Sequence, residues 1–287
     1  MGKLSDRAEI ASAAEFLLSR AQKRPELLGA DVLYVFTKSY SLSLIDGVPE
    51  VLTSGVSGGI SLRCVARDGR QGIATGNDFS LPALADLFDW SCANCLASEK
   101  DESVSLFAGP ICNDDESLGL FDRELEGMGP DYGMDVCVRM YEIARERDPK
   151  VLSVRSSSWS HGIGESYYAS TEGVSAWKSG TTASCGVSVV LRDGDAFEMS
   201  GYGKSERFAS ALDPDGTARL AVDKTLRVLG GRPLPTGKYS LLLEPEVSAS
   251  IVDEIGGMFC SSEVHKGRSL MEGRIGQTVA GPITLVD

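Results

Sequence analysis

The chain has 287 residues, 42% of them hydrophobic and 24% charged, which is enough to bury a core without disulfides or metal ions. Its 28 Lys and Arg against 41 Asp and Glu give a formal net charge of −13. That balance argues against direct binding to nucleic acid or to an anionic membrane surface, because both require clustered positive charge. No apolar run approaches the roughly 18 residues of a membrane span, and residues 1–10 lack the apolar stretch of a secretory signal. Together with seven scattered cysteines, an odd number, these features predict a cytoplasmic protein.

The first hundred residues alternate between helical and strand patterns. Asp6 and Glu9 form a capping pair in front of a segment whose apolar residues recur every three or four positions. Further on, the dipeptide Asp68-Gly69 lies between two apolar runs, which is a strong signal for a β-hairpin. The predicted order is a helix over 10–21, strands over 31–44, 60–66 and 72–75, and a helix over 80–95.

After an acidic, turn-rich crossing at 99–132, the second half is richer in strand patterns. It predicts a helix over 134–144, strands over 151–159, 162–170, 174–191 and 196–202, a helix capped by Asp215, a strand over 239–243, a helix from Pro245 and a strand over 283–286. The fold class is therefore α+β, with mainly antiparallel sheets and packed helices in two consecutive lobes. We predict an N-terminal α+β domain over 1–100, a central β-rich domain over 101–235, and the start of a C-terminal region over 236–287.

Two short motifs resemble catalytic signatures but have unsuitable surroundings. Residues 55–59 match G-x-S-x-G, yet a nucleophile elbow needs a helix directly after the serine, and a strand pattern follows here. We therefore predict a flexible turn between strands at 55–59. Cys92 and Cys95 form a C-x-x-C pair inside a predicted helix, away from the N-terminus whose dipole would lower a thiol pKa. They are predicted to be structural core cysteines.

The chain has only two histidines, His161 and His265, and they lie far apart in the sequence, so no HExxH or HExxxH motif can exist, which excludes a self-contained zinc hydrolase of that type. His161 is predicted to lie in a turn. Three side chains that can carry positive charge, His265, Lys266 and Arg268, follow the last long helix of an otherwise acidic chain. They are a candidate contact for a substrate or partner, with a solvated loop as the alternative interpretation. No catalytic and no metal-binding residue is assigned.

Four segments, in this order along the chain, resemble the TldD/PmbA family. They are SLSLIDGVPE at 41–50, GISLRCVARDGRQGIATGNDFS at 59–80, a central region at 173–203, and KYSLLLEPEV at 238–247. Each motif is weak alone, but the ordered set is fairly specific and spans almost the whole chain. The resemblance implies a cytoplasmic metallopeptidase that trims or matures small peptides, commonly as a heterodimer.

In the zinc subunit of that family, HExxxH lies on the helix after the Leu-Glu-Pro step. The equivalent segment here, EVSASIVDEI at 246–255, contains no histidine. The resemblance is therefore to the metal-free subunit, PmbA or TldE. The family continues into a C-terminal domain beyond the point corresponding to Asp287, so we expect either a fragment or a naturally short member.

The resemblance implies a chain that supplies the walls of a substrate-binding site and a sheet edge. An extended peptide substrate would add to an exposed strand at that edge. We expect no cofactor in this chain and zinc in a partner subunit. The expected partner is a TldD-like zinc subunit or a second copy of the chain, with no direct contact to nucleic acid or membrane. The alternative function is a non-enzymatic, β-rich interaction module that regulates a partner protein, such as the gyrase modulation that the family has also been assigned.

Overall fold

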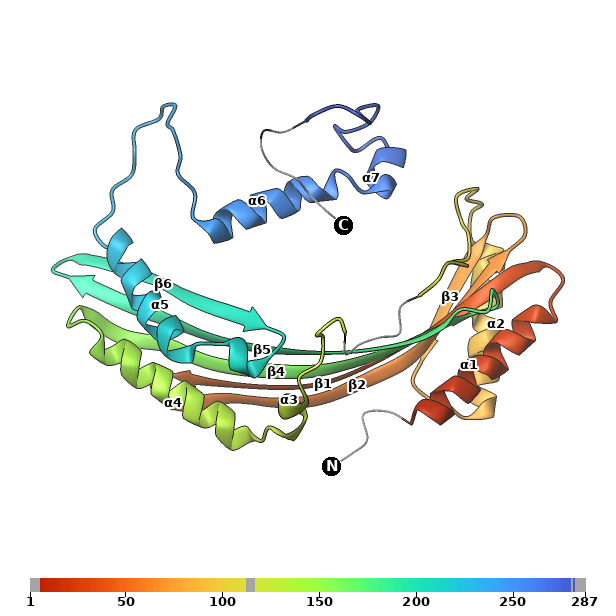
Figure 1. Cartoon of the computed structure of the whole chain (residues 1–287), viewed down its shortest axis with the longest axis horizontal. Helices are drawn as coiled ribbons and strands as arrows, with labels where there is room; N and C mark the ends of the chain where they lie inside the picture. The colour runs from red at the N-terminus through yellow and green to blue at the C-terminus, as the bar shows by residue number, and fades with distance from the viewer. Residues whose placement is uncertain (1–5, 112–116, 280, 282–287) are drawn as a thin grey trace. The chain divides into compact units, whose positions relative to one another are not determined.

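The computed structural model describes residues 6–111, 117–279 and 281, and it divides into two compact units, Met1–Gly231 and Arg232–Asp287. The first unit is built on one six-stranded antiparallel sheet of order β3-β2-β1-β4-β5-β6 with helices packed on it (Figure 1). Each half of the unit contributes three strands, and the pairing of β1 with β4 joins the halves into one sheet. This confirms the predicted α+β fold with antiparallel pairing.

The elements of the first unit have these bounds in chain order: α1 (Arg7–Gln22), β1 (Leu27–Ile45), β2 (Val48–Ala66), β3 (Gln71–Gly76), α2 (Leu81–Ala97), α3 (Arg123–Gly127), α4 (Pro130–Glu146), β4 (Val151–Ser170), β5 (Ser175–Asp193), β6 (Ala196–Glu206), a 3-10 turn η1 (Ala209–Ala211) and α5 (Pro214–Val228). The cap of α5 is Asp213, whose side chain accepts a hydrogen bond from the Gly216 amide, and not the predicted Asp215.

Two of the predicted turns are wrong, because both segments lie inside long strands. Residues 55–59 are in the interior of β2 and pair with β1 throughout. His161 and Gly162 lie in the middle of β4, where β1 pairs on one side and β5 on the other. Gly and Ser favour turns when the backbone is free, but neighbouring strands satisfy the backbone N–H and C=O groups here.

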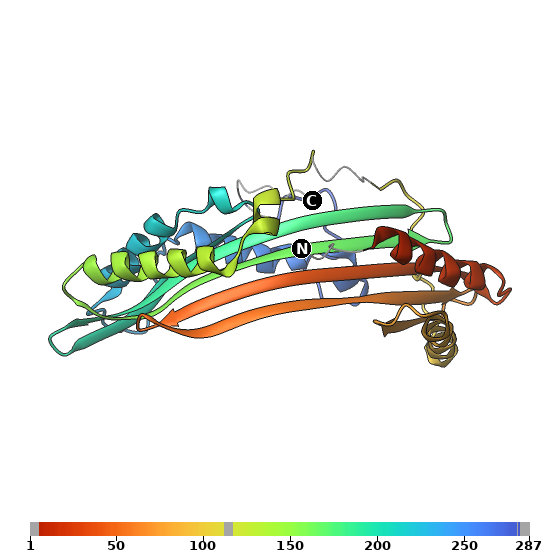
Figure 2. The same ribbon diagram turned by 90° about the horizontal axis from the view of Figure 1, so that it is seen from below.

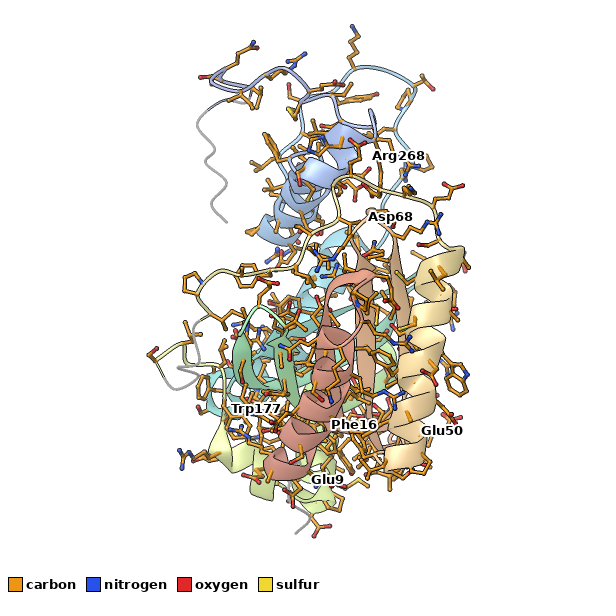
Figure 3. All side chains as sticks on the ribbon, turned by 90° about the vertical axis from the view of Figure 1, so that its right-hand side faces the viewer. Glu9, Phe16, Glu50, Asp68, Trp177 and Arg268 are labelled. Carbon is orange, nitrogen blue, oxygen red and sulfur yellow. The ribbon has the colours of Figure 1, made fainter. Side chains whose placement is uncertain are left out.

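Two apolar clusters form on the same face of the sheet, near opposite ends of its long strands. Even-numbered residues of β1 belong to both: Val32 packs with α1 and α2, and Leu42 packs with α4. Because side chains alternate along a strand, this parity puts both clusters on one face. Figure 1 and Figure 2 show α1 and α4 along that face. Phe16 and Trp177 pack at the margin of the first cluster (Figure 3).

The second unit contains α6 (Pro245–Gly257) and α7 (Ser261–His265). The helix predicted from Pro245 is confirmed, and its apolar residues Val247, Ile251 and Ile255 are 40–48% exposed. The strand predicted over 239–243 is wrong: the described residues there form no strand, and Leu242 is fully exposed at 101%. A short apolar run becomes a strand only where a neighbour completes its hydrogen bonds. The strand predicted over 283–286 lies outside the described residues.

Candidate functional site

The outer edge of β2 is open over much of its length. β1 pairs with the inner edge of β2 along the whole strand, whereas β3 pairs with the outer edge only over 60–65. Within the part of the chain that the structure describes, no strand bonds to the outer edge of residues 48–59. Beside this edge, Val48, Leu52 and Val56 are 63%, 63% and 66% exposed. An open edge with exposed apolar side chains is suited to accept another extended chain.

A pocket of about 170 Å³ adjoins this edge on the helix-covered face. It is lined by Ser54 of β2, Tyr40 of β1 and His161 of β4, and by residues from the end of α3 to the start of α4, within 125–130. Tyr40 pairs directly with Ser54 on one side and with His161 on the other. These three paired residues therefore form one row across the sheet, from the open edge into the pocket. The pocket can receive a side chain of a peptide held at the edge.

His161 is held as a neutral imidazole at the base of this pocket. Its Nδ1 accepts a hydrogen bond from the indole Nε1 of Trp159 at 3.1 Å, and its ring centroid lies 5.3 Å from that of Tyr40. Burial, and secondarily the charge of Lys38, lowers the pKa of His161. A neutral ring whose Nδ1 accepts must carry its proton on Nε2, which is thus the donor that a bound molecule would meet.

His161→Gln should flatten the fall in stability between about pH 7 and pH 5. Since the folded-state pKa of His161 lies below the unfolded value, the unfolded chain takes up the proton first. The stability that the neutral ring contributes is present above the unfolded pKa and is lost as pH falls through the folded pKa. Urea unfolding at both pH values measures the effect, and His265→Gln, at an exposed position, is the control. Equal pH slopes in wild type and His161→Gln would contradict this.

An ion pair to a buried carboxylate lies four residues further along the same face of β4. Glu165 is 3% exposed, and its Oε1 accepts a hydrogen bond from the Arg7 Nε at 2.7 Å. Its Oε2 is buried without a hydrogen-bond partner among the described residues. The Arg7 guanidinium also lies 4.7 Å above the ring of Trp177. Since Arg7 is the first residue of α1, this pair fixes the start of that helix to the middle of the sheet.

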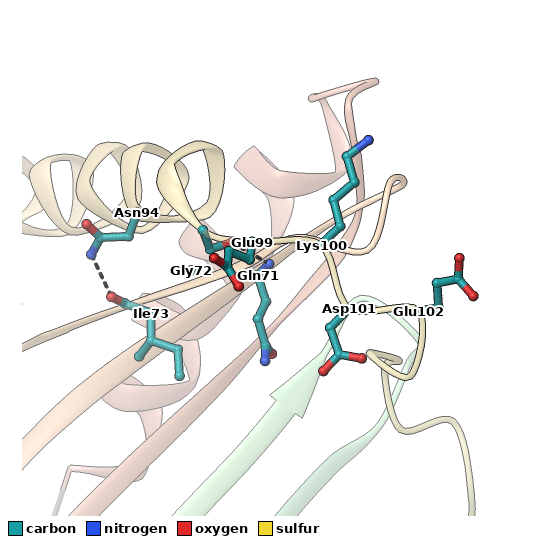
Figure 4. A pocket seen from close by; sticks show the side chains of 9 residues that line it. Gln71, Gly72, Ile73, Asn94, Glu99, Lys100, Asp101 and Glu102 are labelled. Carbon is teal, nitrogen blue, oxygen red and sulfur yellow. Dashed lines mark hydrogen bonds between the residues drawn. The ribbon is translucent and has the colours of Figure 1, made fainter. Parts of the chain in front are cut away.

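A larger, shallow pocket of about 750 Å³ lies beside β3 and the end of α2 (Figure 4). Residues 98–102, with Glu99, Asp101 and Glu102 among them, form one side, and Asn94 donates a hydrogen bond to the Ile73 carbonyl at 2.8 Å. Its lining residues include no His, Cys or Tyr, and we assign it no chemistry.

The candidate contact residues predicted from the sequence lie much later in the chain than the residues that line this pocket. His265 ends α7, and Lys266 and Arg268 follow it, all three exposed in the second unit. None makes an ion pair with another described residue, and their role stays a prediction. The sequence analysis missed His161 as a pocket residue. Its two-residue spacing from Trp159 and Ile163 was the available signal, because it gives His161 the parity of the buried face.

In 6–111, 117–279 and 281, no three His, Cys, Asp or Glu side chains are grouped so that they could hold a metal ion. Within these ranges, no helix combines the length and apolar character needed to cross a bilayer.

Family models of PmbA/TldA metallopeptidases match three successive parts of the chain. Domain 1 matches residues 30–95, the central domain 123–229 and the C-terminal domain 236–287. An uncharacterized protein of Methanocaldococcus jannaschii is 24% identical over 274 residues, and a metalloprotease of the same organism is 22% identical over 269 residues. These alignments cover 94% and 90% of this chain but 61% and 57% of the relatives, so the chain spans about three fifths of their length.

Solved structures share the fold. A candidate modulator of DNA gyrase from Bacteroides thetaiotaomicron has a TM-score of 0.84 at 22% identity, covering 97% of this chain and 63% of that one. TldE from Thermococcus kodakarensis has a TM-score of 0.74 at 16% identity, covering 92% and 59%. With three family models in sequence order over most of its length, the chain belongs to the TldD/PmbA family.

Proposed function

We propose that this chain is a PmbA/TldE-type component of a cytoplasmic TldD/TldE metallopeptidase that matures or degrades peptides. The observation that carries the proposal is family membership combined with a helix α6 that contains no histidine. In the zinc subunits of the family, HExxxH stands on the corresponding helix. A relative named as a metalloprotease supports the reaction class.

In this proposal the partner subunit holds zinc, which activates the water that hydrolyses the peptide bond. This chain binds and orients the peptide. An extended peptide along residues 48–59 would complete main-chain hydrogen bonds that β2 leaves open. Alternate peptide side chains would meet Leu52 and Val56 or enter the pocket over Tyr40 and His161. A peptide must be unfolded to bind in this way, which suits a proteolytic role.

A mixing experiment tests the reaction. The chain and a TldD-like zinc subunit are purified separately, their zinc is determined, and each is incubated alone and together with an unstructured fluorogenic peptide. We expect zinc only in the partner and cleavage that depends on the mixture. Cleavage by the partner that this chain leaves unchanged, or one zinc per copy of this chain, would contradict the proposal.

Leu52→Lys should lower kcat/KM of the mixture about tenfold, which corresponds to about 1.4 kcal/mol, because a charge beside an open edge opposes strand addition. Met199→Lys on the edge strand β6 is the matched control, since Met199 is equally exposed at 63%. If the two variants behave alike, the β2 edge is not the binding site, although the peptidase role could stand.

The second candidate function is a non-enzymatic interaction module that regulates a partner protein. Two structural neighbours named as candidate modulators of DNA gyrase favour it. With a net charge of −13, any effect on DNA topology would run through protein contacts. A chain that binds a partner and changes its activity without promoting peptide cleavage would support this second function.

A further inference from the structure

The fold brings together two cysteines that are distant in sequence. The Sγ atoms of Cys64 and Cys92 lie 3.9 Å apart, although 28 positions separate the residues. Cys64 is on β2 and fully buried at 0% exposure, and Cys92 is on α2 and partly exposed. Cys92 is therefore partly accessible to solvent, whereas Cys64 is enclosed in the core.

The C-x-x-C spacing pointed to a different pair. Cys95 is 1% exposed, as predicted for a core cysteine, and its Sγ donates a hydrogen bond to the Arg70 carbonyl at 3.4 Å. Cys92 instead lies at the margin of the core against Cys64. The strand β2 supplies the sulfur partner, which no sequence spacing indicates.

The surroundings assign different roles to the two thiols. The sulfur–sulfur hydrogen bond with Cys64 lowers the pKa of Cys92; partial burial opposes this shift, and the positive charge of Arg24 adds to it. The same hydrogen bond, followed by burial, raises the pKa of Cys64. Cys92 thus loses its proton more readily than Cys64 and is the thiol that reacts first with an oxidant.

We propose that Cys64 and Cys92 form a reversible disulfide when the protein meets a hydroperoxide. The Cys92 thiolate attacks hydrogen peroxide, the O–O bond breaks, and the leaving hydroxide takes one proton from solvent, so that Cys92 sulfenic acid and water result. The Cys64 sulfur then attacks the sulfenic sulfur, the S–O bond breaks, and a second water leaves with the Cys64 proton. Two thiols are oxidised, one hydrogen peroxide is reduced to two waters, and a small thiol reverses the bond.

Closing the bond requires the sulfurs to approach from 3.9 Å to about 2.05 Å. The backbones are already held together beside the pair, because the Ser91 hydroxyl donates to the carbonyls of Leu62 and Gly72 at 3.1 and 2.9 Å. In this proposal, rotation of the two cysteine side chains provides the remaining approach. The disulfide would lock α2 onto β2 and hold this end of the sheet together.

The test uses the full, reduced chain and hydrogen peroxide as the probe. After treatment under native conditions, free thiols are alkylated and the digest is analysed by mass spectrometry. We expect a peptide cross-linked through Cys64 and Cys92, with a loss of about 2 Da, that dithiothreitol reverses. Cys137 and Cys185 are buried, neither has a sulfur of another described residue within hydrogen-bonding distance, and both should stay reduced.

Two variants separate the roles. Cys95→Ser should still form the cross-link, whereas Cys64→Ser should leave Cys92 to proceed to the sulfinic acid. A cross-link between Cys92 and Cys95, sulfinic acid at Cys92 in the wild type, or an unmodified Cys92 would overturn the proposal. The wild-type peptide map decides the matter even if Cys64→Ser fails to fold.

Discussion

Gly72→Ala should destabilise the first unit by about 3 kcal/mol, because it forces a methyl group into the backbone of α2. A Cβ at position 72 would overlap the Cys95 amide nitrogen and the Ser91 carbonyl oxygen. Both are main-chain atoms of a helix that cannot rotate away as a side chain would. The substitution must therefore separate α2 from β3 and break the hydrogen bond from Ser91 to the Gly72 carbonyl.

Gly76→Ala is the matched control in the same strand. A Cβ there meets only the Leu87 Cδ1 at 3.6 Å, an ordinary contact, so the cost should stay below about 1 kcal/mol. Urea unfolding followed by circular dichroism measures both variants. Similar stabilities for the two would show that α2 shifts freely, and the close approach of helix and strand would then not be essential to the fold.

Arg7→Ala should cost about 2 kcal/mol, since it leaves the Glu165 carboxylate buried without its counter-ion. Breaking a fully buried pair costs more, but the Arg7 side chain is 52% exposed and solvent weakens its attraction. The loss of stability arises mainly from Glu165, whose side chain is 2% exposed and whose Oε2 has no hydrogen-bond partner among the described residues.

The double variant Arg7→Ala with Glu165→Gln should recover part of that loss, because a neutral amide is cheaper to bury than a carboxylate. Lys204→Ala serves as the comparison: it removes a pair with Glu206 at 2.9 Å in which both side chains are substantially exposed, and stability should change little. Equal denaturation midpoints for Arg7→Ala and Lys204→Ala would mean that the Glu165 carboxylate does not depend on Arg7 in the folded chain.

Local patterns were sufficient to predict most elements of the fold. The Asp6 side chain accepts hydrogen bonds from the Ala8 and Glu9 amides and begins α1, as its capping pair predicted. The turn at Asp68-Gly69 joins β2 to β3, with Gly69 at a φ of 86° that suits glycine. These features depend on residues only a few positions apart, so the sequence alone is enough to determine them.

Features that depend on pairing over long distances could not be read from the sequence. The segments at 55–59 and 161–162 have the composition of turns, and only the strands on either side make them continuous β-structure. The same pairing aligns Ser54, Tyr40 and His161 in one row across three strands and creates the pocket at the open edge.

The sequence by itself determined the family, the α+β class, the acidic character and the absence of an HExxxH motif in these 287 residues. The tertiary structure decided which side chains meet. Arg7 reaches Glu165 across 158 positions, and Cys64 reaches Cys92 across 28. The physical reason is that backbone hydrogen bonds are the same for every residue type, so strand order and register follow from the packing of the whole sheet and not from any local signal.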